Sequence, residues 1–215
     1  MTPIRAIISD FGGVLTSPLL RSFAAFQDSS GIPLEALGVA MARIAHEDGE
    51  HPLFELEKGK ITEVVFLDRL GEVLSDELGR PVHMHGFSET YFSHLHPNEP
   101  MIAAMRSLAD RGLRMALLTN NVREWEPKWR AMLPVDEIFE MVVDSAFVGM
   151  RKPDPEIYEL TLTGLDLNAP QCIFVDDIEI NCDTARELGM VAVWFRSNEQ
   201  AIAEIEAALV QQGAA

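Results

Sequence analysis

The chain has 215 residues, 47% of them hydrophobic, which is enough for one large domain or for a core with a smaller insertion, so we do not expect disorder. It carries 17 Lys and Arg against 34 Asp and Glu, and the formal net charge of −17 repels nucleic-acid backbones and anionic membrane surfaces. We therefore expect neither nucleic acid nor a membrane as partner. An anionic small molecule would need a nearby lysine or metal cation to offset this charge.

The first eleven residues, MTPIRAIISDF, contain an apolar run that is too short for the core of a signal peptide. No later stretch approaches the roughly 18 apolar residues of a membrane span. This predicts a cytoplasmic protein. The two cysteines, Cys172 and Cys182, have neither metal-ligand nor CxxC spacing, and we expect buried free thiols.

Short apolar runs predict five strands, at residues 4–10, 113–119, 141–143, 172–176 and 190–195. Most of these runs are continuous rather than alternating, which is typical of parallel strands buried on both faces. Helical patterns follow or separate them at residues 98–111, 123–132, 154–164, 178–188 and 199–211. This alternation predicts an α/β fold with a Rossmann-like, doubly wound parallel sheet.

Residues 16–95 interrupt the alternation. This stretch of about eighty residues has helical periodicity and acidic clusters but no convincing strand, and it is too long for a structureless loop. We expect it to form a helical cap inserted after the first strand. The α/β core domain would then comprise residues 1–15 and 96–215.

The stretch SDFGGVLTS places Asp10 at the end of the first predicted strand, followed by Gly12 and Gly13. Asp and Gly together are ordinary turn residues, so this stretch alone favours a structural turn. Ligands of open α/β sheets, however, bind beyond the carboxyl ends of the strands. The other polar residues that follow strands or begin the Pro-started helix there are Thr119, Asn120, Lys152, Asp176, Asp177 and Asn181.

Asp176 and Asp177 are adjacent carboxylates after a hydrophobic strand, and like charges this close need a cation to remain ionised. Magnesium suits the position because it prefers oxygen ligands and binds through one or two carboxylates, water and phosphate oxygens. The alternative for this pair is a helix N-cap beside the positive end of the helix. For Asp176 we expect both interpretations to hold in part.

Four motifs in order, DFGGVLT, LLTNN, RKPDPEIY and VDDIEIN, make the sequence resemble the haloacid dehalogenase-like (HAD) hydrolase superfamily over nearly its whole length. The segment FELEKGKIT at residues 54–62 is similar to the acidic, glycine-containing segment of the helical cap in that superfamily. The segments VGMRKPDPEIY and VDDIEIN also resemble the corresponding segments of the phosphatase-like N-terminal domain of bifunctional soluble epoxide hydrolases.

The resemblance implies a magnesium-dependent phosphatase for a small phosphorylated metabolite. In that reading Asp10 is the nucleophile and forms an aspartyl-phosphate, which divides one difficult displacement into two easier ones. Lys152 would neutralise the charge of Asp10 and of the phosphoryl oxygens, which Thr119 and Asn120 would hold. The protein could also form a homodimer.

The resemblance also implies a Mg²⁺ site. Asp10, Asp177 and the backbone carbonyl of Gly12 would hold the ion, while Asp176 would act as a further metal ligand or, with Asn181, support the others. Because this contact comes from the backbone carbonyl of residue 12, a glycine at that position can make it as well as any other residue.

Gly12 stands where phosphatases of the superfamily usually carry a second aspartate that protonates the leaving alkoxide. Such a group contributes about 10² to 10⁴ in rate, so its loss favours good leaving groups. Two alternatives remain: a carbon–halogen hydrolase, whose halide needs no proton, and a catalytically weak binding or regulatory protein. A histidine of the predicted cap could also replace the acid, although surface roles are the simpler reading for His83, His85, His94 and His96.

Overall fold

The computed structural model describes residues 2–84 and 86–212. At its centre is a five-stranded parallel sheet with the strand order β3-β2-β1-β4-β5. The strands are β1 (Ala6–Ser9), β2 (Arg114–Thr119), β3 (Met141–Asp144), β4 (Cys172–Asp176) and β5 (Val191–Trp194). The α/β fold and the parallel sheet predicted from the sequence are confirmed. Because β1 is central, the strand order reverses between β1 and β4, which is where ligands bind in such sheets.

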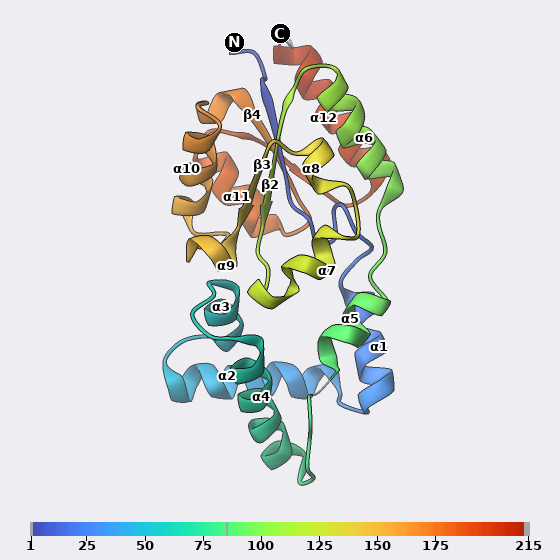
Figure 1. Ribbon diagram of the computed structural model, residues 1–215. Helices are drawn as coiled ribbons and strands as arrows, with labels where there is room; N and C mark the ends of the chain where they lie inside the picture. Colours follow the sequence, from blue (N-terminus) through green and yellow to red (C-terminus); the bar gives the residue numbers. More distant parts are fainter. Residues whose placement is uncertain (1, 85, 213–215) are drawn as a thin grey trace.

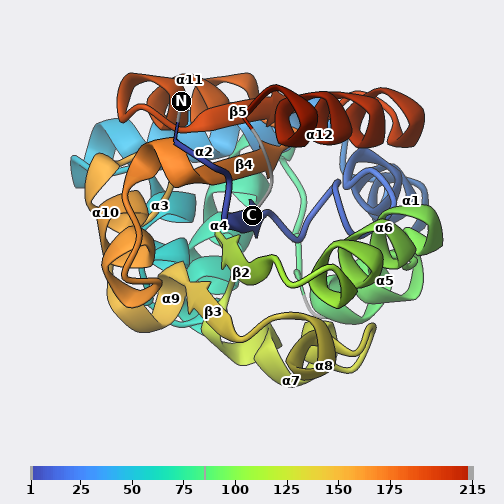
Figure 2. The ribbon, with the colours of Figure 1, turned by 90° about the horizontal axis from the view of Figure 1, so that it is seen from above.

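Both faces of the sheet are covered by helices, as Figures 1 and 2 show. On one face lie α6 (Glu99–Asp110) and α12 (Asn198–Gln212), and on the other α10 (Pro155–Gly164) and α11 (Glu179–Glu187). Successive strand residues point to opposite faces. Ile7 therefore packs in the hydrophobic cluster with Met101 and Ile205, while Ile8 packs in a second cluster with Tyr158.

The connections contain short elements that the sequence pattern does not predict well. The helix expected at 123–132 is a 3-10 turn, η1 (Arg123–Trp125), followed by α7 (Glu126–Arg130). The four-residue helices α8 (Val135–Ile138) and α9 (Ser145–Val148) were not predicted, because one turn leaves no detectable periodicity. A second 3-10 turn, η2 (Ala169–Gln171), precedes β4.

Between β1 and α6 the described residues form five helices, which lie beyond the carboxyl ends of the strands in Figure 1. They are α1 (Leu20–Ser30), α2 (Leu34–Asp48), α3 (Pro52–Glu57), α4 (Glu63–Leu78) and α5 (Phe87–Ser93). These helices share a hydrophobic cluster that includes Phe26, Ile44, Leu70 and Leu74. We call residues 16–95 the helical segment.

The chain leaves the sheet and returns to it at neighbouring positions. Thr16 and Pro97 form an antiparallel bridge, and the Ser17 N–H donates to the His96 carbonyl at 2.7 Å. The Asn98 N–H donates to the Leu15 carbonyl at 2.9 Å. These crossings lie at the boundaries expected from the sequence, while the division into a core domain and a cap domain stays a prediction.

Cys172 and Cys182 are buried and free, as the sequence predicts. Among the residues that the structure describes, no helix is both long enough and apolar enough to cross a membrane. The cytoplasmic location stays a prediction.

Candidate active site

Asp10 lies directly after β1, where its backbone N–H donates to the Val175 carbonyl at 2.8 Å. The chain then turns through Gly13, which has a φ of +76°. A side chain at Gly13 would be strained at this φ, and its Cβ would also overlap the carboxylate of Asp177. The Gly13 N–H donates to the hydroxyl of Thr16 at 3.0 Å, which fixes the turn. Gly13 is therefore required both by the backbone and by the neighbouring carboxylate.

Gly12 differs from Gly13, because its φ lies outside the left-handed region that favours glycine. A Cβ at Gly12 would lie 3.2 Å from Cδ1 and 3.4 Å from Cδ2 of Leu19, which are the flexible end of a side chain. The backbone does not demand a glycine at position 12. A side chain there would face Leu19 in the helical segment rather than Asp177.

Lys152 is 1% exposed, and its ammonium group contacts two carboxylates. Its Nζ lies 2.7 Å from Oδ1 of Asp10 and 2.6 Å from Oδ2 of Asp176. The other oxygen of Asp176, Oδ1, accepts hydrogen bonds from Asn181 Nδ2 at 3.0 Å and from the Ile178 N–H at 2.8 Å. Both oxygens of Asp176 are thus engaged by protein donors, which places Asp176 as a support for Lys152.

Asn120 holds the backbone of Lys152 through its side-chain amide. Its Nδ2 donates to the Lys152 carbonyl at 2.9 Å, and its Oδ1 accepts from the Lys152 N–H at 2.9 Å. The buried hydroxyl of Thr119 makes a long contact of 3.5 Å with the Asn120 carbonyl, which leaves it easy to redirect. Asn120 therefore positions Lys152, and its contact with phosphoryl oxygens stays a prediction.

Asp10, Asp176 and Asp177 form a cluster in which one oxygen from each residue lies within 4.8 Å of the others. Burial raises the pKa of Asp10, the nearby Lys152 ammonium opposes that rise, and Asp176 and Asp177 add to it. Burial followed by the charge of Asp176 raises the pKa of Asp177 to about 6. Burial alone would lower the pKa of Lys152, but Asp10 and Asp176 outweigh it and raise that pKa.

The donor set fits a divalent cation such as Mg²⁺. Lys152 contacts two of the three carboxylates, so negative charge is in excess in a cluster where Asp10 and Asp176 are buried and Asp177 is half-buried. Carboxylate oxygens are the ligands that Mg²⁺ prefers. Because Asp176 already binds protein donors with both oxygens, Asp10 and Asp177 are the carboxylates available to an ion. Contact of the ion with the Gly12 carbonyl stays a prediction.

A cavity of about 310 Å³ reaches this edge of the sheet at Gly12, Thr119 and Asn120. Its far walls come from the helical segment, including Phe66 of α4 and Tyr91 of α5. Burial, followed by the negative charges of Asp10, Asp177 and Glu57, raises the pKa of Tyr91. The candidate active site thus joins the carboxylate cluster to a space enclosed by helices.

Two polar contacts of residues that line this space were not predicted from the sequence. Arg151 Nε donates to Oε2 of Glu57 at 2.7 Å, and Trp125 Nε1 donates to Oε1 of Glu63 at 2.8 Å. Burial raises the pKa of Glu57, while the adjacent Arg151 opposes that rise. Glu57 lies in the segment FELEKGKIT, but its partner Arg151 is 94 residues away in sequence and leaves no local signal.

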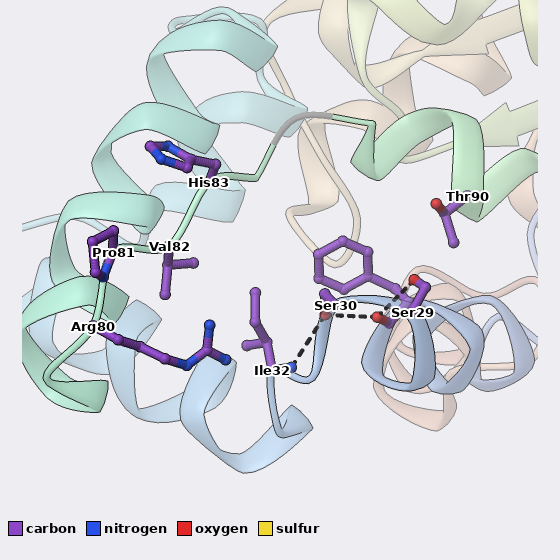
Figure 3. Close-up of a pocket in the computed structure, with 9 residues that line it drawn as sticks. Ser29, Ser30, Ile32, Arg80, Pro81, Val82, His83 and Thr90 are labelled. Atoms are coloured by element: carbon purple, nitrogen blue, oxygen red, sulfur yellow. Dashed lines mark hydrogen bonds between the residues drawn. The ribbon is translucent and has the colours of Figure 1, made fainter.

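A second hollow, of about 210 Å³, lies within the helical segment between the end of α1 and residues 80–83 (Figure 3). The Ser30 hydroxyl donates to the Phe26 carbonyl at 2.7 Å and accepts from the Ile32 N–H at 3.2 Å. Ser29 likewise donates to the Phe26 carbonyl at 3.1 Å. These hydroxyls complete the end of α1, and none of the carboxylates of the cluster lines the hollow.

Among the residues that the structure describes, the histidines of the helical segment do not supply an evident acid. His94 is exposed, with Nδ1 at 3.0 Å from both the Thr90 carbonyl and the Ser93 hydroxyl. None of the described histidines lines the cavity that reaches Gly12. His85 lies outside the described residues.

The family is evident once this geometry is compared with known proteins. A family model described as haloacid dehalogenase-like hydrolase matches residues 4–189. The chain therefore belongs to the haloacid dehalogenase-like hydrolases, as its four motifs predict.

Curated relatives include phosphatases and larger proteins. The chain is 31% identical over 212 residues to acyl-CoA dehydrogenase family member 10 of Mus musculus, covering 95% of the chain and 19% of that protein. It is 27% identical to bifunctional epoxide hydrolase 2 of Rattus norvegicus, covering 94% of the chain and 38% of that protein. It is 30% identical to sesquiterpene phosphatase astK of Aspergillus oryzae, covering 89% of the chain and 90% of that protein. The chain thus spans well under half of the first two relatives.

Solved structures share the fold. A HAD family enzyme of Bacteroides thetaiotaomicron matches with a TM-score of 0.71 and 25% identity, covering 91% of this chain and 95% of that one. The same enzyme in complex with magnesium and inorganic phosphate matches with a TM-score of 0.65 and 24% identity, covering 90% and 94%. At this level of identity the second likeness shows the fold alone.

Proposed function

We propose that this protein is a magnesium-dependent phosphatase that hydrolyses a small phosphorylated molecule through an aspartyl-phosphate on Asp10. The observation that carries the proposal is the buried contact of Asp10 with Lys152, at the point where the strand order reverses and beside Asp177. Sesquiterpene phosphatase astK, a relative matched over 90% of its own length, supports the same reaction class.

In the first step an oxygen of Asp10 attacks phosphorus. The Asp10–phosphorus bond forms, and the bond from phosphorus to the leaving oxygen breaks, so the leaving group departs with the electron pair. The ammonium of Lys152, 2.7 Å from Oδ1 of Asp10, offsets the negative charge of the nucleophile and of the phosphoryl oxygens. The Thr119 hydroxyl is available to donate to one of those oxygens. In the second step water attacks phosphorus, which releases phosphate and restores Asp10.

A magnesium ion would be held by Asp10 and Asp177, with the Gly12 carbonyl as a further ligand. When bound, it would supply positive charge that reduces repulsion between these carboxylates and the phosphate dianion. Asp176 and Asn181 would act indirectly, because they hold Lys152 and each other. The enzyme from Bacteroides thetaiotaomicron, which shares this fold, was crystallised with magnesium and inorganic phosphate.

Gly12 gives the proposed phosphatase an unusual weakness. It cannot protonate the leaving oxygen, so negative charge must be carried by the leaving group itself. The enzyme should therefore prefer leaving groups of low pKa. The helical segment, acting as a cap, would exclude water and select the leaving group.

The experiment is a panel of phosphate monoesters assayed with Mg²⁺ and with excess chelator. We expect phosphate release that requires the cation and is abolished in Asp10→Asn, which keeps the shape of the side chain. Unchanged turnover in Asp10→Asn would contradict the nucleophilic role. Halide release from haloacids in the presence of chelator, without phosphatase activity, would instead identify a carbon–halogen hydrolase.

A further inference from the structure

We propose that the substrate is a phosphate monoester whose leaving group is uncharged and apolar, with roughly ten carbons, and that the hydrocarbon part of this group occupies the cavity beyond Gly12. This inference rests on the proposed phosphatase function and specifies its leaving group. It follows from the position of the cavity, its apolar lining, the hydrogen bonds that the polar groups of its wall already make, and its size.

The cavity lies on the leaving-group side of the site. It reaches the sheet edge at Gly12, Thr119 and Asn120, which adjoin the nucleophile and the predicted phosphoryl contacts. A side chain at Gly12 would face Leu19, which is itself part of the cavity wall. A phosphate beside Asp10 would therefore have its ester group directed into this space.

The wall presents hydrocarbon to an occupant. Aromatic side chains from α1, α4 and α5 meet aliphatic side chains and methionines from α2 to α4 and from the segment before α5. Examples from different elements are Phe23, Met41, Phe66 and Met84. Methionine side chains adapt to occupants of differing shape, and apolar contact adds affinity in proportion to the area removed from water.

The polar groups of the wall are mostly bound to the protein already. Glu63 accepts from Trp125 Nε1 at 2.8 Å, and Glu57 accepts from an arginine side chain at 2.7 Å. Asn121 Oδ1 accepts from the Val122 N–H at 2.9 Å, and both ends of the Asn120 amide are bound to the Lys152 backbone. Trp129 Nε1 is a buried donor of the wall without a partner among the described residues, so it could match one acceptor. The several hydroxyls of a sugar or other polyol would lose water without each gaining a partner, which is costly. This pattern disfavours sugar phosphates.

The size of the cavity limits the leaving group. Its volume is about 310 Å³, at the lower end of ligand pockets. If each methylene group takes up roughly the 30 Å³ of a water molecule, the cavity accommodates about ten carbons. The wall is curved and rich in rings, so a branched or cyclic hydrocarbon should fit as well as a linear one.

The test is a series of primary n-alkyl phosphates from methyl to hexadecyl, assayed below their micelle concentrations. The leaving alcohols have closely similar pKa values, so the absence of an acid at Gly12 affects the whole series alike. We expect kcat/KM to rise about fourfold per methylene group up to about ten carbons and then to level off or fall. A profile that is flat with chain length would overturn the apolar-substrate inference while leaving the phosphatase proposal intact.

A matched pair of variants on α2 locates the effect. Met41→Gln preserves side-chain size but adds an amide to the cavity wall, whereas Val39→Gln changes a residue that is 49% exposed on the same helix. Met41→Gln should lower kcat/KM for decyl phosphate about tenfold and leave methyl phosphate within twofold. Val39→Gln should match the parent protein on both esters. Equal losses on both esters in Met41→Gln would contradict the cavity assignment.

Binding of non-hydrolysable phosphonates separates the two proposals if no ester is turned over. Calorimetry with Mg²⁺ present should show decylphosphonate binding at least a hundredfold more tightly than methylphosphonate. Such binding without turnover of any ester would contradict the phosphatase function but uphold the apolar cavity. Equal affinity, or no binding of decylphosphonate, would overturn the apolar-substrate inference.

Discussion

Gly13 and Asp177 lie so close that a Cβ on Gly13 would overlap the Asp177 carboxylate. Gly13 follows β1 and Asp177 follows β4, so two segments that are far apart in sequence meet at this contact. The two glycines after Asp10 therefore have different tasks. Gly13 makes room for a carboxylate, and Gly12 leaves the path to the cavity free of an acid.

Gly13→Ala should abolish activity for a steric reason. The alanine must either leave its φ of +76° or displace Asp177, so we expect at least a hundredfold loss in kcat/KM and weaker Mg²⁺ binding. Gly112→Ala is the control, because Gly112 has a φ of +88° with nothing within 4 Å of the added Cβ. The control should lose only roughly 1–2 kcal/mol of stability and keep its activity. Normal activity in Gly13→Ala would contradict the steric argument.

Asp176→Asn and Asp177→Asn should have different effects although the residues are adjacent. Lys152 pairs with Asp10 and Asp176 rather than with Asp177, which leaves the Asp177 carboxylate for an ion, so its amide variant should weaken Mg²⁺ binding at least tenfold in calorimetry. Asp176 supports Lys152 with both oxygens engaged, so its variant should bind Mg²⁺ nearly as well but lose about 10- to 100-fold in rate. Similar loss of Mg²⁺ affinity in both variants would make Asp176 a direct ligand.

Rates of Asp10 phosphorylation should depend steeply on leaving-group pKa. Aryl phosphates of acidic phenols should react far faster than those of weakly acidic phenols, when measured in single-turnover experiments that isolate the first step. Gly12→Asp should flatten this dependence, because the Leu19 side chain can move aside for the new carboxylate. A shallow dependence in the native protein would mean that another residue, such as Glu57, donates the proton.

Asp144 should make the stability of the fold depend on pH. Its Oδ1 accepts from the Ala146 N–H at 3.0 Å, while Oδ2 is buried without a partner among the described residues. Burial raises the pKa of Asp144 from 3.8 to about 6. The contribution of the protonated Asp144 carboxyl to the free energy of unfolding is therefore fully present below pH about 4 and is lost as the pH rises through 6.

Asp144→Asn keeps the Oδ1 acceptor and removes the charge. At pH 8 it should unfold at higher denaturant concentration, with a gain of about 1–3 kcal/mol, and at pH 4 the gain should vanish. Asp28→Asn, at an exposed position on α1, is the control and should change little. A gain that is independent of pH would show that the carboxylate charge is not its cause.

The sequence was informative about the sheet and the residues at its edge because these are local signals. The strands β1, β2 and β4 are largely continuous apolar runs, and Asp10, Thr119 and Asp176 occur where these runs end. Parallel strands then carry those ends to one edge, which made the grouping of Asp10, Asp176 and Asp177 predictable. The short helices α8 and α9 were missed because one turn has no period to detect.

Contacts that depend on how distant segments pack could not be predicted. Nothing local to Asn120 indicates that its amide binds the Lys152 backbone, 32 residues away. The same holds for the pairing of Glu57 with Arg151 and for the overlap of Gly13 with Asp177. The cavity likewise arises from five helices whose separate amphipathic patterns give no measure of the space between them.

The central claim is that Asp10 becomes phosphorylated, and rapid acid quenching during turnover tests it most directly. The protein is mixed with Mg²⁺ and an aryl phosphate labelled in its phosphoryl group, quenched, digested and mapped by mass spectrometry. We predict label on the peptide that contains Asp10, released by hydroxylamine as expected for an acyl phosphate, and absent in Asp10→Asn. Turnover without label on Asp10, or label on a histidine, would contradict the account.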